Sequence, residues 1–142
     1  MTKSLFIFAL IAGCVFQSVA HEPVIDSLAN GKIIFIRSTG FMGSSAAFKT
    51  FIDEVFVCRL NNKRYSVIEV TSGVHSASVQ FGGTKSKERA EKFEVTVQPG
   101  ETKYIQIVFE NGVLINNVYC EEVTENTALQ KMKSLKEDTK CQ

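Results

Sequence analysis

Short apolar segments alternate with turn residues along most of this chain, and this pattern constrains its fold more than any other feature. Segment 75–81 is typical, because His75, Ala77, Val79 and Phe81 alternate with polar residues and would share one face of a strand. Similar segments cover residues 32–37, 48–52, 55–60, 65–70, 75–81, 93–97, 104–109 and 113–120. Many short strands at regular spacing predict an all-β fold, a single small β-sandwich of seven to eight antiparallel strands over residues 31–122.

The turn residues support this prediction. Pro99-Gly100 fits the centre of a type II turn, because Pro fixes the first φ and Gly tolerates a positive second φ. Asn61-Asn62-Lys63 and Asn111-Gly112 are typical of hairpin turns. The Gly- and Ser-rich stretch 38–45 is interpreted as a flexible connector.

The chain changes character after residue 122. Thr124 can act as the N-cap of a helix, and Glu125 would lie in its first turn. We predict a short amphipathic C-terminal helix over residues 123–136, docked on the sandwich or projecting from it, and a fraying tail over 137–142. The apolar residues at helical spacing are Ala128, Met132 and Leu135. The basic residues that make this helix a candidate interaction surface are Lys131, Lys133 and Lys136.

The first residues have the pattern of a secretory leader. Lys3 is followed by an almost wholly apolar run over residues 4–16, and then by the small residues Ser18-Val19-Ala20. The apolar run is shorter than the roughly 20 residues that a spanning helix needs. We predict a signal peptide over residues 1–20, cleaved after Ala20, and a polar tether over 21–30.

A second cleavage is an alternative. Ile11-Ala12-Gly13-Cys14 resembles a bacterial lipobox, in which Cys14 would be lipidated and become the new N-terminus. Both cleavages predict an extracytoplasmic protein. It would be either secreted or periplasmic, or a membrane-anchored lipoprotein.

Charge excludes one class of partner. The formal net charge of +1 is carried by Lys3 in the leader, so the remainder of the chain is neutral. A neutral domain has no bulk attraction for nucleic acid or for an anionic membrane. We therefore expect no nucleic-acid partner, and membrane association only through a lipid anchor at Cys14.

Either cleavage leaves three cysteines in the mature domain, and an oxidising compartment allows one disulfide among them. Cys58 and Cys120 each follow an apolar strand pattern, whereas Cys141 lies in a polar tail. We predict that any intramolecular bridge joins Cys58 to Cys120. The alternative is that both are reduced core thiols.

No catalytic motif is present in the sequence, which lacks the metalloprotease, nucleophile-elbow and phosphate-loop patterns. Of the two histidines, His75 begins a strand on its apolar face, where a buried ring usually hydrogen-bonds to local partners. We interpret it as structural, with a ligand or base at the sandwich rim as the alternative. We therefore expect no enzyme activity and no cofactor.

A copper site is the alternative function. Cleavage after Ala20 would place His21 at the N-terminus, where its α-amine and ring nitrogen could bind one metal ion. His75 could complete a three-nitrogen set suited to copper. This arrangement resembles the histidine brace of exported copper proteins.

The order of the turns also resembles a bacterial envelope family known as domain of unknown function 2846, over residues 31–136. The segments that carry the resemblance are Gly31–Arg37, Asp53-Glu54, Ser72-Gly73-Val74-His75, Pro99-Gly100-Glu101-Thr102, Tyr104, and the acidic stretch Glu121, Glu122 and Glu125 before a closing Leu- and Lys-bearing helix. The chain departs from the family pattern at Glu54, Ser72 and Val74. The resemblance implies a transthyretin-like or carboxypeptidase-regulatory-like sandwich that is exported and often lipid-anchored, and it implies no catalytic residues.

Together these features predict an exported, non-enzymatic β-sandwich module that binds or scaffolds in the cell envelope. Its partner would be an envelope protein, a glycan or a small ligand.

Overall fold

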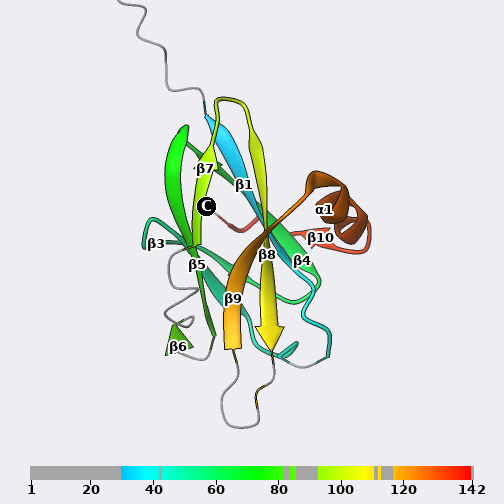
Figure 1. Cartoon of the computed structure of the whole chain (residues 1–142). Coiled ribbons are helices and arrows are strands. Elements are labelled where there is room, and N and C mark those ends of the chain that lie inside the picture. The colour runs from blue at the N-terminus through cyan, green and yellow to red at the C-terminus, as the bar shows by residue number, and fades with distance from the viewer. Residues whose placement is uncertain are drawn as a thin grey trace, which may run out of the picture.

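The computed structural model describes residues 30–41, 43–81, 84–85, 93–110, 112 and 117–141. These residues form two five-stranded sheets that face each other (Figure 1). Sheet A has the strand order β10 (Lys136–Glu137), β4 (Arg64–Val70), β1 (Gly31–Arg37), β8 (Thr102–Glu110) and β9 (Asn117–Val123). Sheet B has the order β3 (Val55–Leu60), β2 (Phe48–Ile52), β5 (Gly73–Phe81) and β6 (Thr84–Lys85), and β7 (Phe93–Val97) also pairs with β5. The predicted β-sandwich is confirmed.

The strand pairing differs from the prediction of antiparallel strands, because two of the strand pairs are parallel. β1 pairs with β4 antiparallel but with β8 parallel, and β10 pairs with β4 parallel. Strand β1 therefore lies inside sheet A between partners of opposite direction. Its apolar run is continuous because both of its faces are covered. Ile33 and Phe35 join the core between the sheets, whereas Ile34 and Ile36 lie under the helix α1 (Glu125–Met132).

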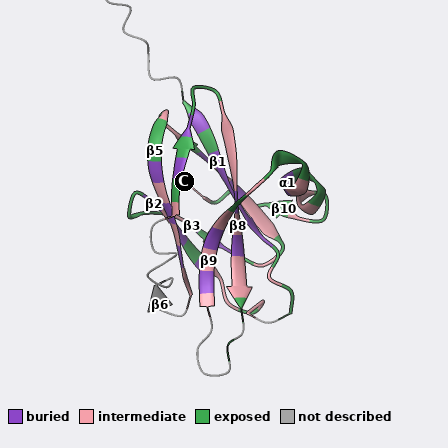
Figure 2. Ribbon diagram, in the orientation of Figure 1, coloured by how far each residue is buried: buried purple, intermediate pink, exposed green. Residues whose placement is uncertain are grey.

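Figure 2 shows that buried residues run along the strands of both sheets, while α1 is largely exposed on its outer side. A small second core lies between α1 and sheet A, where Ala128 is fully buried and Met132 and Leu135 are partly buried. The predicted N-cap is confirmed, because the Thr124 hydroxyl accepts a hydrogen bond from the Thr127 amide at 3.4 Å. The helix is docked on the sandwich.

The helix is shorter than predicted, and residues 137–141 are attached to the sandwich by β10 and by a disulfide rather than frayed. After Met132 the amides of Ser134 and Leu135 bond to carbonyls three residues earlier, which tightens and ends the helix. Residues 136–137 then extend as β10 beside β4. The Lys136 amide donates to the Lys63 carbonyl at 3.2 Å, and the Asp138 amide donates to the Tyr65 carbonyl at 2.8 Å.

The Pro99-Gly100 turn has the predicted form. The Glu101 amide donates to the Gln98 carbonyl at 2.9 Å, and Gly100 has a φ of 74°. Asn111 lies outside the described residues, but the strands on either side of it, β8 and β9, pair antiparallel as a hairpin requires.

The β2–β3 turn holds two L-residues in a left-handed conformation. Asp53 has a φ of 50° and Glu54 a φ of 67°, the signs that a type I′ hairpin turn needs at both central positions. This conformation costs a residue with a Cβ about 1–2 kcal/mol.

We predict that Glu54→Gly raises the free energy of unfolding by roughly 0.5–1 kcal/mol, because the relief of strain exceeds the added entropy of the unfolded chain. Urea denaturation measures this change. Gly100→Ala is the matched control of opposite sign. Gly100 also has a positive φ and open space around its Cβ position, so a methyl group there adds strain without a clash. A loss of stability in Glu54→Gly would contradict the prediction.

Candidate functional site

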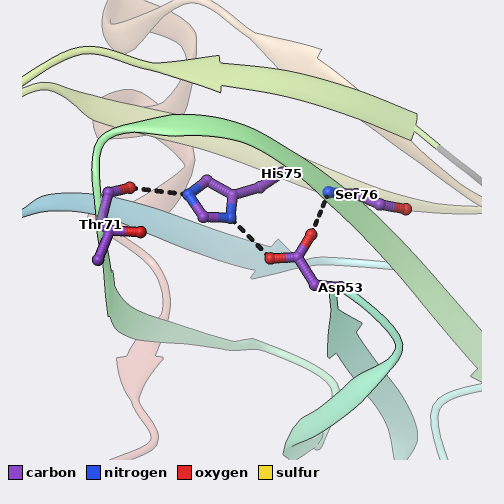
Figure 3. A network of polar contacts seen from close by, with 4 residues as sticks. All are labelled: Asp53, Thr71, His75 and Ser76. Atoms are coloured by element: carbon purple, nitrogen blue, oxygen red, sulfur yellow. Dashed lines mark hydrogen bonds and ion pairs between the residues drawn. The ribbon is translucent and has the colours of Figure 1, made fainter.

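His75 lies at the start of β5 with both ring nitrogens bonded (Figure 3). Its Nδ1 is 2.8 Å from the Asp53 Oδ2, and its Nε2 is 2.7 Å from the Thr71 carbonyl oxygen. The other Asp53 oxygen accepts a hydrogen bond from the Ser76 amide at 2.8 Å. The network thus joins the strained β2–β3 turn to the chain between β4 and β5.

The two partners determine the protonation of the ring. A carboxylate and a backbone carbonyl are both acceptors, so each His75 nitrogen must carry a proton and the ring is an imidazolium. Burial by itself lowers the pKa of His75, but the hydrogen bonds to Asp53 and Thr71 and the Asp53 charge outweigh it and hold the pKa above 6.5. Burial raises the pKa of Asp53, but the bonds from His75 and Ser76 outweigh it and hold that pKa below 3.8.

This geometry supports the structural interpretation of His75. A general base or a metal ligand needs a free lone pair on a ring nitrogen, and here both nitrogens donate. The Asp53–His75 contact looks like the orienting half of a catalytic triad, but Nε2, which would face a nucleophile, bonds to Thr71. The suggested role of His75 as a copper ligand therefore does not fit its partners. His21 lies outside the described residues, among which no three His, Cys, Asp or Glu side chains are grouped to hold a metal ion.

We predict a pH dependence of stability that His75→Gln removes. A raised folded-state pKa contributes stability that is fully present below about 6.5 and is lost as pH rises through the folded-state value. Asp53 contributes stability with the opposite pH dependence. Its contribution is present above pH 3.8 and is lost as the pH falls through the lower folded-state pKa of Asp53. The wild-type Tm should therefore decline on the alkaline side of the His75 titration, and His75→Gln should lack this decline. Thermal unfolding across the pH range measures it, and equal pH profiles for the two proteins would contradict the role of His75.

The disulfide joins Cys58 to Cys141, and Cys120 is a free, buried thiol. The predicted Cys58–Cys120 bridge is therefore wrong. Strand β3, which carries Cys58, lies against β4, whereas β9, which carries Cys120, lies against β5. β9 is three strands away from β4 in sheet A, a separation of about 14 Å at the usual strand spacing, and a disulfide needs Cα atoms within about 7 Å. Burial raises the pKa of Cys120 to about 12, which keeps it a neutral thiol.

An open cleft of about 490 Å³ lies beside the N-terminus of α1. It is lined by residues 100–104 from the start of β8 and residues 122–125 from the end of β9 and the helix cap. The side chains that define its chemistry are Glu101, Glu122 and Glu125, with Lys103 and Tyr104. We call this feature the β8–β9 cleft.

Ion pairs organise one side of the β8–β9 cleft. The Lys103 ammonium lies 2.9 Å from Glu101 and 3.3 Å from Glu122. The hydrogen bond to Glu101 and the two negative charges hold the pKa of Lys103 above its usual value. The Tyr104 hydroxyl donates to Glu125 across 3.4 Å. With three carboxylates and one ammonium, the lining is mostly hydrogen-bond acceptors.

The three lysines proposed as a contact surface do not form one free set. The Lys131 ammonium donates to the Gln106 side chain, which attaches it to sheet A. Lys133 and Lys136 are exposed, but Lys136 belongs to β10 rather than to the helix. Cys14, the candidate lipidation site, lies outside the described residues.

Sequence reasoning missed a buried arginine. Arg37 is fully buried, and its guanidinium lies over the Phe48 ring at 3.6 Å from the centroid. Its Nη1 donates to the Leu60 carbonyl at 2.6 Å and its Nη2 to the Gly43 carbonyl at 2.7 Å. Burial lowers its pKa to about 10. Strand parity was the available signal, because Arg37 shares the inward face of β1 with Ile33 and Phe35.

Arg37 and Asn62 together hold the stretch 38–45, which was interpreted as a flexible connector. The Asn62 side chain donates to the Gly40 carbonyl at 2.7 Å and accepts from the Thr39 amide at 3.0 Å. The Ser44 amide donates to the Phe41 carbonyl at 3.2 Å, which closes a turn. A side chain from β1 and one from the turn between β3 and β4 therefore fix the backbone on both sides of Phe41.

No protein-family model matches this chain, and no curated protein is significantly similar to it. None of the helices in the described residues has the length and apolar character to cross a membrane.

Proposed function

We propose that this protein is an exported β-sandwich module of the cell envelope that binds a small polar ligand in the β8–β9 cleft. The cleft is the observation that carries the proposal, because its volume of about 490 Å³ falls in the range of ligand sites. Its walls are built on two paired strands and a capped helix, which gives a rigid frame. The turn order that resembles domain of unknown function 2846 agrees with export, which that resemblance implies.

The lining indicates the chemistry of the ligand. Carboxylates accept hydrogen bonds, so Glu101, Glu122 and Glu125 suit a ligand that carries amine or hydroxyl donors. Lys103 compensates part of the negative charge by its contacts with two of them. An amino sugar or a similar small cation fits this balance better than an anion does.

Export rests on the leader pattern and is supported by the Cys58–Cys141 disulfide, since disulfides persist in oxidising compartments. The intact mass of the protein from its native envelope tests it. A mass that begins at His21, or at a lipidated Cys14, would agree with export. The mass of the complete chain would contradict it.

Ligand binding is tested by NMR titration with glucosamine and with N-acetylglucosamine, which differ in the charge of one nitrogen. Glucosamine should shift the amide resonances of residues 102–104 and 123–125 and should bind the more tightly. Glu122→Gln should weaken this binding about fivefold, because a charge-assisted hydrogen bond is lost. Glu69→Gln, an exposed carboxylate on β4 outside the cleft, is the matched control. An absence of shifts at these residues, or equal binding by Glu122→Gln, would contradict the proposal.

A further inference from the structure

Phe41 is the most exposed large hydrophobic residue in the described part of the chain, with 91% of its surface accessible. A single exposed apolar residue on the face of a strand or helix is common and needs no explanation. Phe41 instead occupies the tip of a turn, between Gly40 and Gly43, which both have positive φ. The side chain therefore projects away from the sandwich.

Hydrogen bonds from two side chains hold the backbone on either side of Phe41. Asn62 bonds the Gly40 carbonyl on one side, and Arg37 bonds the Gly43 carbonyl on the other. Gly43 also lies close to the Phe109 ring, 3.3 Å from the position of an added Cβ. Fixing an apolar tip in this way removes the entropy cost of ordering it on contact. The fold thus presents a phenyl ring in advance of binding.

Basic residues adjoin this tip. Asn62, which bonds the Gly40 carbonyl, is followed by the exposed Lys63 and by the half-buried Arg64. The Lys63 carbonyl accepts the Lys136 amide, which brings the exposed Lys136 to the same corner. The acidic groups there are Glu137, whose carboxylate accepts from Tyr65, and Asp138, which accepts from the Lys140 amide. Three cations and two anions leave this corner positive.

We propose that this corner is a membrane contact, in which Phe41 enters the interfacial layer of a bilayer while Lys63, Arg64 and Lys136 face anionic headgroups. Charge complementarity selects an anionic lipid surface as the occupant, since a projecting aromatic ring with cations behind it suits a layer that is apolar inside and negative outside. This contact acts independently of any lipid anchor and goes beyond ligand binding in the β8–β9 cleft.

The chain contains no tryptophan, so Phe41→Trp places a single local fluorophore at the tip. With vesicles of phosphatidylcholine and phosphatidylglycerol in equal amounts, its emission should shift to the blue, and vesicles of phosphatidylcholine alone should shift it less. Phe56→Trp is the matched control, because Phe56 is 50% exposed on β3 and lies in sheet B. Its emission should not change. The local readout is needed because the apolar residues 4–16 of the full chain can themselves partition into lipid.

Partition of the full chain and its variants into vesicles then gives the contribution of each side chain to membrane binding. Phe41→Ala should weaken partition into the anionic vesicles about tenfold, the loss expected for a buried phenyl side chain. Lys63→Glu and Lys136→Glu should each weaken it about fivefold or more. Lys49→Glu, an exposed lysine on β2, is the control for net charge. An unchanged emission of a folded Phe41→Trp variant would overturn the proposal, as would an equal loss with Lys49→Glu. A folded Phe41→Ala variant that partitions normally would also overturn it and would point to a protein pocket for Phe41.

Discussion

Breaking the Cys58–Cys141 disulfide is expected to lower the free energy of unfolding by about 4.5 kcal/mol, the loop-entropy value for a closed loop of this size. The two cysteines are 83 residues apart in the sequence, so the bridge removes a large set of conformations from the unfolded chain. Cys141 also packs against the main core, and Figure 1 shows the chain after β10 passing between the sheets toward its C-terminal end. Loss of the bridge releases this segment from β3.

Urea denaturation of Cys141→Ser, and of the wild-type protein with and without a thiol reductant, measures this effect. The reduced wild type and Cys141→Ser should have similar midpoints, both well below that of the oxidised protein. The reductant should not change Cys141→Ser further, because Cys120 is a free thiol in both states. Equal midpoints for the oxidised and reduced wild type would contradict the prediction.

Arg37→Ala is expected to cost about 3 kcal/mol or more, for two reasons that a second variant separates. The substitution leaves the Leu60 and Gly43 carbonyls without their donors, and it opens a cavity against the Phe48 ring. Removal of the buried cation offsets part of this loss of stability, because the folded protein no longer bears the cost of burying a charge. The described residues include no carboxylate paired with Arg37, and its Nε has no partner among them.

Arg37→Met keeps most of the volume but removes the hydrogen-bond donors and the positive charge. It should cost about 2 kcal/mol, since each unpaired buried carbonyl costs about 1–3 kcal/mol and the relief from burying a charge is subtracted. In both variants the amides around Phe41 should become mobile in NMR relaxation, because the Gly43 carbonyl loses its bond. A Met variant as stable as the wild type would show that the cost of burying the charge equals the value of the two hydrogen bonds.

The same bonds connect stability to the proposed membrane contact. Arg37→Met should therefore weaken vesicle partition even though Arg37 is fully buried. Asn62→Ala, which frees the Gly40 carbonyl at the surface, should weaken it with a smaller loss of stability. If Asn62→Ala weakens vesicle partition with little loss of stability, the weaker partition is caused by altered positioning of Phe41 and not by unfolding.

Local physics made much of this fold predictable. The strands 48–52, 55–60 and 93–97 occur as the period-two pattern predicts, and the Thr124 cap and the Pro99-Gly100 turn have their expected geometry. These features depend on neighbouring residues only: alternation of side chains, a fixed φ, or a hydroxyl three residues from an amide. The two-residue strands β6 and β10 had no such pattern to reveal them.

The sequence by itself therefore determined the positions of most strands and the local geometry of the helix cap and of the Pro99-Gly100 turn. The tertiary structure decided which strands and side chains are neighbours. The parallel pairing of β1 with β8, the choice of Cys141 over Cys120, and the contact of His75 with Asp53 all join residues far apart in the chain. The β8–β9 cleft depends in the same way on how sheet A and α1 are stacked. Such contacts follow from strand order and sheet stacking, which many sequences with the same alternation could satisfy differently, so no local pattern encodes them.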